Sequence, residues 1–70
     1  MQTLIAVSHV NGSWRLDVEG CEPMLYLSGG RAERDAKRLA CCLAECGCEA
    51  LVHIHDRQDV LVGDHCFYAD

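Results

Sequence analysis

The first third of the chain alternates between apolar and polar side chains as two paired strands do. Residues 3–10 are rich in aliphatic and β-branched side chains, and residues 14–19 alternate strictly between large apolar and polar ones. Asn11-Gly12 lies between the two segments, and this dipeptide favours a two-residue hairpin turn. The turn would set Val7 opposite Leu16, so the large apolar residues of both strands share one face of a sheet.

The opposite face of this predicted hairpin is mostly polar. The same turn places the remaining side chains there, and they are Ser8, Arg15, Ala6, Asp17, Leu4 and Glu19. This composition is typical of the solvated side of an antiparallel sheet that packs on one face alone. On the apolar face, the register sets His9 beside Trp14.

The middle of the chain changes to a helical spacing. Its apolar residues follow one another at offsets of four, three, four and three, and they are Ala32, Ala36, Leu39, Leu43 and Cys46. The pattern predicts a helix over residues 31–46 that turns these side chains, and Cys42 with them, toward the core. Ser28 is suited to cap the N-terminus, and Gly47 suits the left-handed residue that ends a helix.

Shorter apolar segments predict the other strands. Residues 24–27 follow a turn that contains a proline, residues 50–55 read as a buried strand, and residues 60–62 return from a polar turn with residues 65–68 as a continuation. The order of strands, one helix and strands again predicts an α+β fold in a single domain spanning residues 1–70. We expect an antiparallel sheet of four to five strands with one helix packed on one face.

Composition limits the function classes. The chain has 70 residues, of which 50% are hydrophobic and 24% charged, as in folded proteins. A chain of this length buries too little surface to enclose a cofactor cavity or to form a two-domain enzyme. The pattern contains no catalytic triad or phosphate-binding loop, and its carboxylates fall at surface positions. We therefore expect a protein that is not an enzyme, with no catalytic residues and no cofactor.

Six cysteines and four histidines raise the alternative of a metal or redox protein. Cys41-Cys42 and Cys46-Gly47-Cys48 do not have the C-x2-C spacing that structural zinc sites favour. His53 and His55 share one face of a predicted strand, and we expect them to face water. We therefore expect no metal ligands, with Cys41 the exposed thiol of the helix. The rival interpretation uses Cys42, Cys46, Cys48 and one histidine.

Nucleic acid and membranes are not the expected partners. The predicted helix carries Arg31, Arg34, Lys37 and Arg38, but the chain has a net charge of -5, which opposes direct binding to nucleic acid. Its charge-free stretches are far shorter than the roughly 20 residues that span a bilayer. The first residues lack the basic start of a signal peptide, so we expect a cytoplasmic protein.

The acidic balance predicts the kind of partner instead. Eleven acidic residues stand against six basic ones, and several fall on the outer face of the first hairpin or at strand ends. Carboxylates on a rigid sheet attract a protein with a basic surface and speed its approach, although most acidic surfaces serve only solubility. The residues that we expect to bind such a partner are Asp17, Glu19, Glu22, Asp56, Asp59 and Asp64.

The order of motifs resembles a family of small bacterial and phage domains of unknown function. The residues that carry the resemblance are the run NGSWRLDVEG at 11–20, then Ser28 with Ala32, Ala36, Leu39 and Ala40, then Leu51-Val52-His53 and Asp56. That family combines a tryptophan hairpin, an A-x-x-x-A-x-x-L-A helix and a final V-V-H-x-D hairpin that usually ends in Asp-Gly. This chain has Gln58-Asp59 at that place, and the family implies no activity.

In size, acidity and layout the chain is also similar to small anti-CRISPR proteins of phages and mobile elements. That resemblance implies a non-enzymatic inhibitor whose acidic surface imitates nucleic-acid phosphate and occupies a basic site, such as one on a CRISPR effector complex. A further alternative is a homodimer with a housekeeping role, because one helix covers little of such a sheet and its edge strands are exposed.

Overall fold

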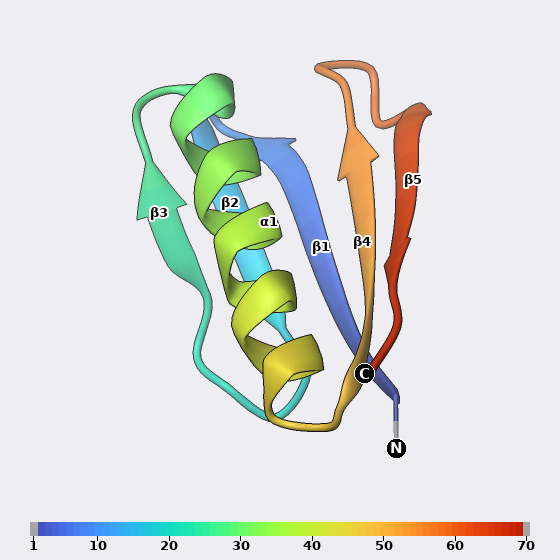
Figure 1. Ribbon diagram of the computed structural model, residues 1–70. Helices are drawn as coiled ribbons and strands as arrows, with labels where there is room; N and C mark the ends of the chain where they lie inside the picture. The colour runs from blue at the N-terminus through green and yellow to red at the C-terminus, as the bar shows by residue number, and fades with distance from the viewer. Residues whose placement is uncertain (1, 70) are drawn as a thin grey trace.

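The structure, a computed structural model, describes residues 2–69 of the chain. One helix lies across one face of a five-stranded sheet with the strand order β3-β2-β1-β4-β5 (Figure 1). The elements are β1 (Gln2–Val10), β2 (Ser13–Val18), β3 (Met24–Tyr26), α1 (Gly29–Glu45), β4 (Glu49–His55) and β5 (Leu61–Phe67). The predicted α+β fold with a single helix is confirmed.

The β1–β2 hairpin has the turn and register that its sequence predicts. Asn11 and Gly12 both adopt positive φ angles, of 49° and 81°, as a two-residue turn of this kind requires. Val7 pairs with Leu16 and His9 with Trp14, whose ring centroids are 5.0 Å apart in an edge-to-face arrangement.

The sheet is mixed, whereas the sequence pattern was interpreted as wholly antiparallel. β4 runs parallel to β1, with Ile5 opposite Val52, and the other three pairings are antiparallel. The reason lies in the connection. β1 and β3 form the two outer edges of the β1–β3 meander and run in the same direction, and α1 reverses the chain once before β4. β4 is therefore parallel to whichever of those edges it joins.

Both ends of α1 are capped as predicted. The Ser28 hydroxyl accepts a hydrogen bond from the Arg31 backbone N–H at 3.4 Å. At the other end Gly47 has a φ of 90°, and the Cys48 N–H donates to the Leu43 carbonyl at 2.8 Å, which completes a Schellman motif. These caps fix where the chain leaves the helix and enters β4.

The core lies between α1 and the sheet, and small residues line the helix side of it. The fully or almost fully buried residues are Ile5, Val7, Leu16, Ala32, Ala36, Ala40, Ala50, Val52 and Ile54. Leu39 and Leu43 pack beside the three helical alanines. The predicted burial of Cys42 and Cys46 is wrong, because both are exposed. Cys42 lies about 120° around the helix from Ala36, the middle of the alanine row, and Cys46 is the C-cap residue beyond the last turn.

The short strand β3 is held to the helix by a side-chain hydrogen bond. The Tyr26 hydroxyl donates to Oδ2 of Asp35 at 2.8 Å. This bond raises the pKa of Tyr26 above its usual value of 10.0, and partial burial and the negative charge of Asp35 add to the effect. β3 thus depends on one polar contact as well as on its pairing with β2.

Candidate functional site

The face of the sheet opposite α1, which we call the open face, is not covered by any element of residues 2–69. Side chains alternate along a strand, so the residues between the buried ones point to this side. One row crosses four strands from Asp17 through Ala6 and His53 to Asp64. The next row runs from Leu4 through Leu51 to Cys66.

Three of the six predicted partner-binding carboxylates lie on this open face. Asp17 accepts a hydrogen bond from Nε of Arg15 at 2.9 Å, and Oε2 of Glu19 accepts one from the Leu4 N–H at 3.2 Å. Oδ1 of Asp64 lies 3.5 Å from Nε2 of His53. Hydrogen bonds thus hold Asp17 and Glu19 in place, and Arg15 offsets part of the negative charge.

Glu49, at the start of β4, is an open-face carboxylate that the sequence analysis missed. It pairs with Gln2, and its charge contributes to the raised pKa of Tyr68, whose largest cause is the side-chain hydrogen bond with Cys66. The signal was present in the alternation of β4, where Glu49 shares parity with the outward-facing His53. With Glu49 included, four carboxylates and one guanidinium among residues 2–69 share the open face.

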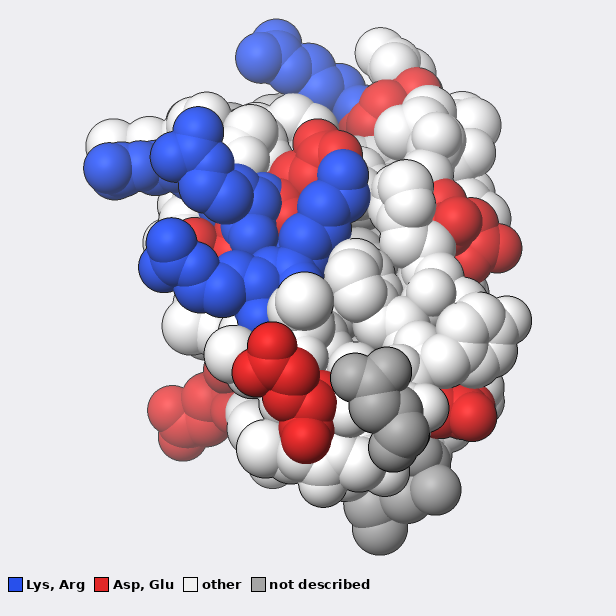
Figure 2. Space-filling model, in the orientation of Figure 1, with Lys and Arg blue, Asp and Glu red and all other residues white. Residues whose placement is uncertain are grey.

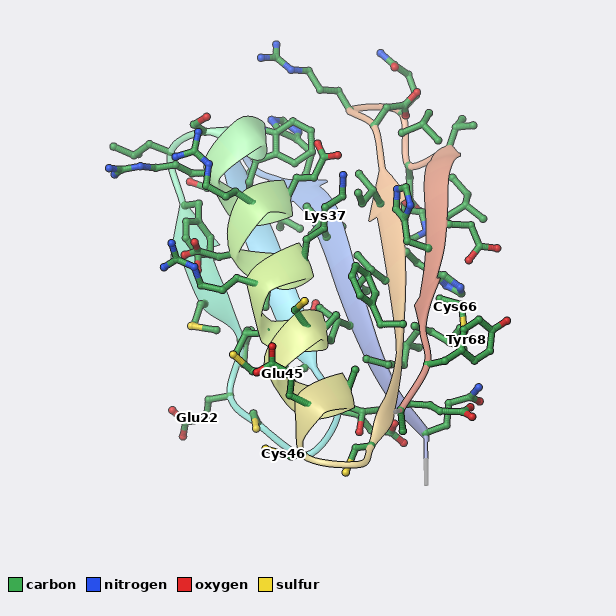
Figure 3. All side chains as sticks on the ribbon, in the orientation of Figure 1. Glu22, Lys37, Glu45, Cys46, Cys66 and Tyr68 are labelled. Atoms are coloured by element: carbon green, nitrogen blue, oxygen red, sulfur yellow. The ribbon has the colours of Figure 1, made fainter. Side chains whose placement is uncertain are left out.

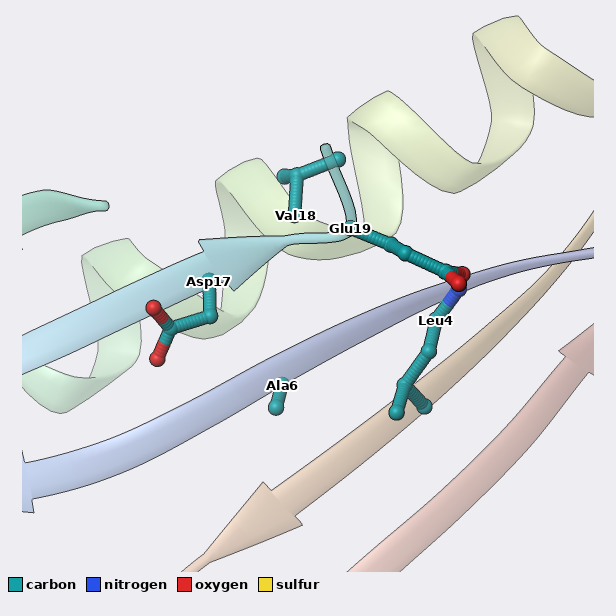
Figure 4. A pocket seen from close by; sticks show the side chains of 5 residues that line it. All are labelled: Leu4, Ala6, Asp17, Val18 and Glu19. Carbon is teal, nitrogen blue, oxygen red and sulfur yellow. The ribbon is translucent and has the colours of Figure 1, made fainter. Parts of the chain in front are cut away.

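The open face has a shallow hollow with an apolar floor. Its volume is about 350 Å³, and Leu4, Ala6, Asp17, Val18 and Glu19 line it. Leu4, Ala6 and Asp17 point away from α1, while Val18 points toward it (Figure 4). Leu4 is 41% exposed although it lies in the interior of the sheet. The hollow therefore offers an apolar contact between two carboxylates.

The other three predicted carboxylates lie at the ends of the molecule. Glu22 is in the turn between β2 and β3 (Figure 3), and Asp56 and Asp59 are in the turn between β4 and β5. Oδ1 of Asp56 accepts hydrogen bonds from the N–H groups of Gln58 at 2.8 Å and Val60 at 3.0 Å. Asp56 therefore holds its turn together, and the structure does not bring these three groups to the open face.

Positive charge collects on the other side of the molecule. The outer surface of α1 carries a basic patch, which is visible in Figure 2 and consists of Arg31, Arg34, Lys37 and Arg38. Lys37 is paired with Glu33 at 3.0 Å, one helical turn away. Four of the basic residues therefore lie on the helix, together with acidic ones such as Glu33, and most sheet carboxylates lie on the face behind it.

The residues of the rival metal interpretation are not brought together. Cys42 and Cys46 lie exposed on the helix, whereas His53 and His55 are on the opposite side of the sheet. Nδ1 of His55 instead donates to the Val7 carbonyl at 3.1 Å. Across residues 2–69, no group of three or more His, Cys, Asp or Glu side chains is placed to hold a metal ion.

The helix gives no indication of a membrane-spanning role. Within the described part of the chain, α1 is the helix to consider, and it is neither long nor apolar enough to cross a bilayer.

Comparison with known proteins identifies no relative. No family model matches the chain, and neither a curated protein nor a solved structure matches it. The resemblance to small bacterial and phage domains therefore stays a prediction.

Proposed function

We propose that the protein is a non-enzymatic binding module that takes a basic protein surface onto the open face of its sheet. The observation that supports this most is the combination of four carboxylates, Asp17, Glu19, Glu49 and Asp64, with the exposed apolar hollow around Leu4. Apolar contact supplies binding energy at the centre, and the surrounding charges select the partner and speed its approach.

The rigidity of the open face favours this function. Its carboxylates lie on three strands of one sheet, β2, β4 and β5, or directly after β2, and Asp17 and Glu19 are already hydrogen-bonded in the free protein. Groups that are fixed before binding lose little conformational entropy when the partner arrives. The Arg15–Asp17 pair lowers the local negative charge, so the apolar hollow is as much a part of the proposed site as the charge.

A pair of charge-reversed baits tests this function. Asp17→Lys with Asp64→Lys changes the open face, and Glu22→Lys with Glu45→Lys makes the same change in net charge elsewhere, on the β2–β3 turn and on the helix (Figure 3). Each bait is used to capture proteins from the native cell, and the captured proteins are identified by mass spectrometry. We expect the wild type and the second bait to retain the same basic partner and the first bait to lose it.

The kinetics of the captured complex give the second readout. Long-range attraction acts on the association step, so reversal on the open face should slow association about tenfold at low salt and much less at high salt. If both double variants bind the partner as fast as the wild type does, the open face is not the binding site.

The narrower role that the sequence suggests, an anti-CRISPR-like inhibitor, is one case of this function. The partner would then be a CRISPR effector complex with a groove for nucleic acid, and the protein would compete with the nucleic acid for that groove. A binding assay with labelled guide or target strand decides this, because the protein should displace the strand and the open-face double variant should not.

A further inference from the structure

The two outer edges of the sheet differ in how well they are protected from pairing with another strand. β3 has three residues and is preceded by Pro23, and both features discourage the addition of a strand. β5, on the other side in Figure 1, has seven residues and contains no proline, lysine or arginine. Its one acidic side chain is Asp64 and its ladder with β4 is irregular only near Ile54 and His55, so most of the outer edge of β5 is open to a partner strand.

Exposed apolar side chains border this edge at both of its ends. Val60 and Val62 are 55% and 63% exposed at the start of β5, and Tyr68 is 70% exposed just after its end. Tyr68 lies beside Cys66 on the open face (Figure 3). Asp64 and His65 lie between these ends, and Cys66 and Phe67 lead from them to Tyr68, so the C-terminal half of the edge combines polar and aromatic side chains.

We propose that β5 pairs with β5 of a second copy of this chain, antiparallel, so that two five-stranded sheets join into one. A two-fold axis perpendicular to the sheet produces this pairing, since an antiparallel strand pair has that symmetry itself. Both helices would lie on one side, and the two open faces would form one continuous surface on the other. This inference does not depend on the proposed function.

The two-fold axis limits the register. In an antiparallel pair, two opposed residues point to the same face of the sheet. The two-fold axis must therefore pass beside one residue of β5, which stands opposite the same residue of the second copy. An axis at Asp64 sets two carboxylates against each other, and an axis at His65 sets two imidazoles against each other. An axis at Gly63 falls beside the bulge in the β4–β5 ladder, where pairing is irregular.

An axis at Cys66 gives complementary neighbours on both faces. Asp64 then stands opposite Tyr68 of the second copy, so a carboxylate meets a hydroxyl donor on the open face. His65 stands opposite Phe67 on the helix side, where aromatic pairs add stability. Among the described residues of the edge, this register sets no like charges opposite each other, and it is the one that we assign.

The oligomeric state of the full chain under reducing conditions tests the pairing. Sedimentation should show a species with twice the 7.7 kDa mass of one chain at about 100 µM, a concentration at which even modest affinities populate a dimer. Tyr68→Glu places a carboxylate opposite Asp64 twice in each dimer and should weaken dimerisation about tenfold. Adding Asp64→Lys to that variant should restore it. A wild type that stays monomeric overturns the proposal.

A change at the opposite edge is the matched control. Leu25 on β3 is 71% exposed, and Leu25→Glu should leave the dimer intact. If Leu25→Glu dissociates the dimer and Tyr68→Glu does not, the β5 interface is wrong. Circular dichroism of each variant establishes that a change in mass does not come from unfolding.

Cross-linking tests the register directly. Opposed residues in antiparallel strands have Cα atoms about 4.5–5.5 Å apart, within the range of a disulfide. In a chain that keeps Cys66 and has serine at the other five cysteines, diamide should remove two electrons and two protons from the two thiols and leave a disulfide-linked dimer. A chain that keeps only the exposed Cys46 is the control. Equal amounts of linked dimer from the two chains would contradict the assigned register.

Discussion

The two faces of the sheet differ in what they contribute. On the helix side, Ile5, Leu16 and Val52 are completely shielded from water, whereas on the open face Leu4 remains 41% exposed in the interior of the sheet. Burial of apolar surface supplies most of the stability of a domain, so the helix side holds the fold together. The open face contributes little to stability and is free to differ in chemistry, which is the condition that a binding surface requires.

The largest expected effect contrasts a buried residue with an exposed one. Leu16→Ala should lower the free energy of unfolding by about 2–5 kcal/mol, because it removes buried methyl groups and leaves a cavity. Leu4→Ala should cost about 0.5 kcal/mol or less. Urea unfolding followed by circular dichroism measures both values. Equal losses would mean that the open face is covered in the folded protein.

Gly29 and Gly30 test how closely the helix approaches the sheet. A Cβ atom at Gly29 would lie 2.8 Å from Cε2 of Trp14, whereas one at Gly30 would have only the Ser28 hydroxyl oxygen nearby, at 3.6 Å. Gly29→Ala should cost about 1–3 kcal/mol through overpacking, and Gly30→Ala should be neutral or stabilising by up to about 1 kcal/mol. Thermal unfolding of the two variants distinguishes them. A loss at Gly30 as large as that at Gly29 would contradict the close contact with Trp14.

Asp56 and Asp17 sharpen the comparison between carboxylates that hold the fold and those that are displayed. Asp56→Ala leaves two backbone N–H groups without their acceptor and should cost about 1–2 kcal/mol, and Asp56→Asn should recover part of the loss. Asp17→Asn, which weakens one exposed ion pair, should cost about 0.5 kcal/mol or less. Denaturant midpoints give these losses of stability. A larger loss for Asp17→Asn than for Asp56→Ala would mean that Asp17, and not Asp56, holds the fold together.

The smallest expected effect depends on pH and concerns β3. The folded protein raises the pKa of Tyr26, so the hydrogen bond to Asp35 stabilises the fold below pH 10 and is lost as the pH rises through the raised pKa. Tyr26→Phe should therefore cost about 1 kcal/mol at pH 7. The difference from the wild type should shrink at high pH, and unfolding measured from pH 7 to 11 tests this. A difference in stability that stays constant from pH 7 to 11 would mean that the ionisation of Tyr26 does not affect the stability of the fold.

Local signals allowed much of the fold to be predicted. Asn11-Gly12 determines the hairpin register without help from the rest of the chain, and Ser28 and Gly47 mark the helix ends. The parallel partner of β4 was missed because the pattern was interpreted one hairpin at a time. It follows from strand direction alone once the three-stranded meander and the single helix are considered together.

The candidate site was harder to predict, because the sequence pattern does not show whether a carboxylate near the end of a strand holds a turn together or lies on the open face. Asp56 and Asp64 are eight positions apart, yet the first holds a turn and the second lies on the open face. Cys42 was misplaced for a related reason. A helical repeat gives the spacing of the buried residues but does not show which side of the helix is buried most deeply. That side carries the three alanines packed against the sheet, and not the cysteines.

The central position of β1 affects how the protein emerges from the ribosome. β2 can cover one edge of β1 as soon as the hairpin has been synthesised, but the other edge awaits β4, which begins at residue 49. Until then a nascent chain presents an unpaired strand that contains Ile5 and Val7, a segment prone to aggregation and to capture by chaperones. Truncation of the chain before β4 should thus impair solubility far more than the number of removed residues suggests.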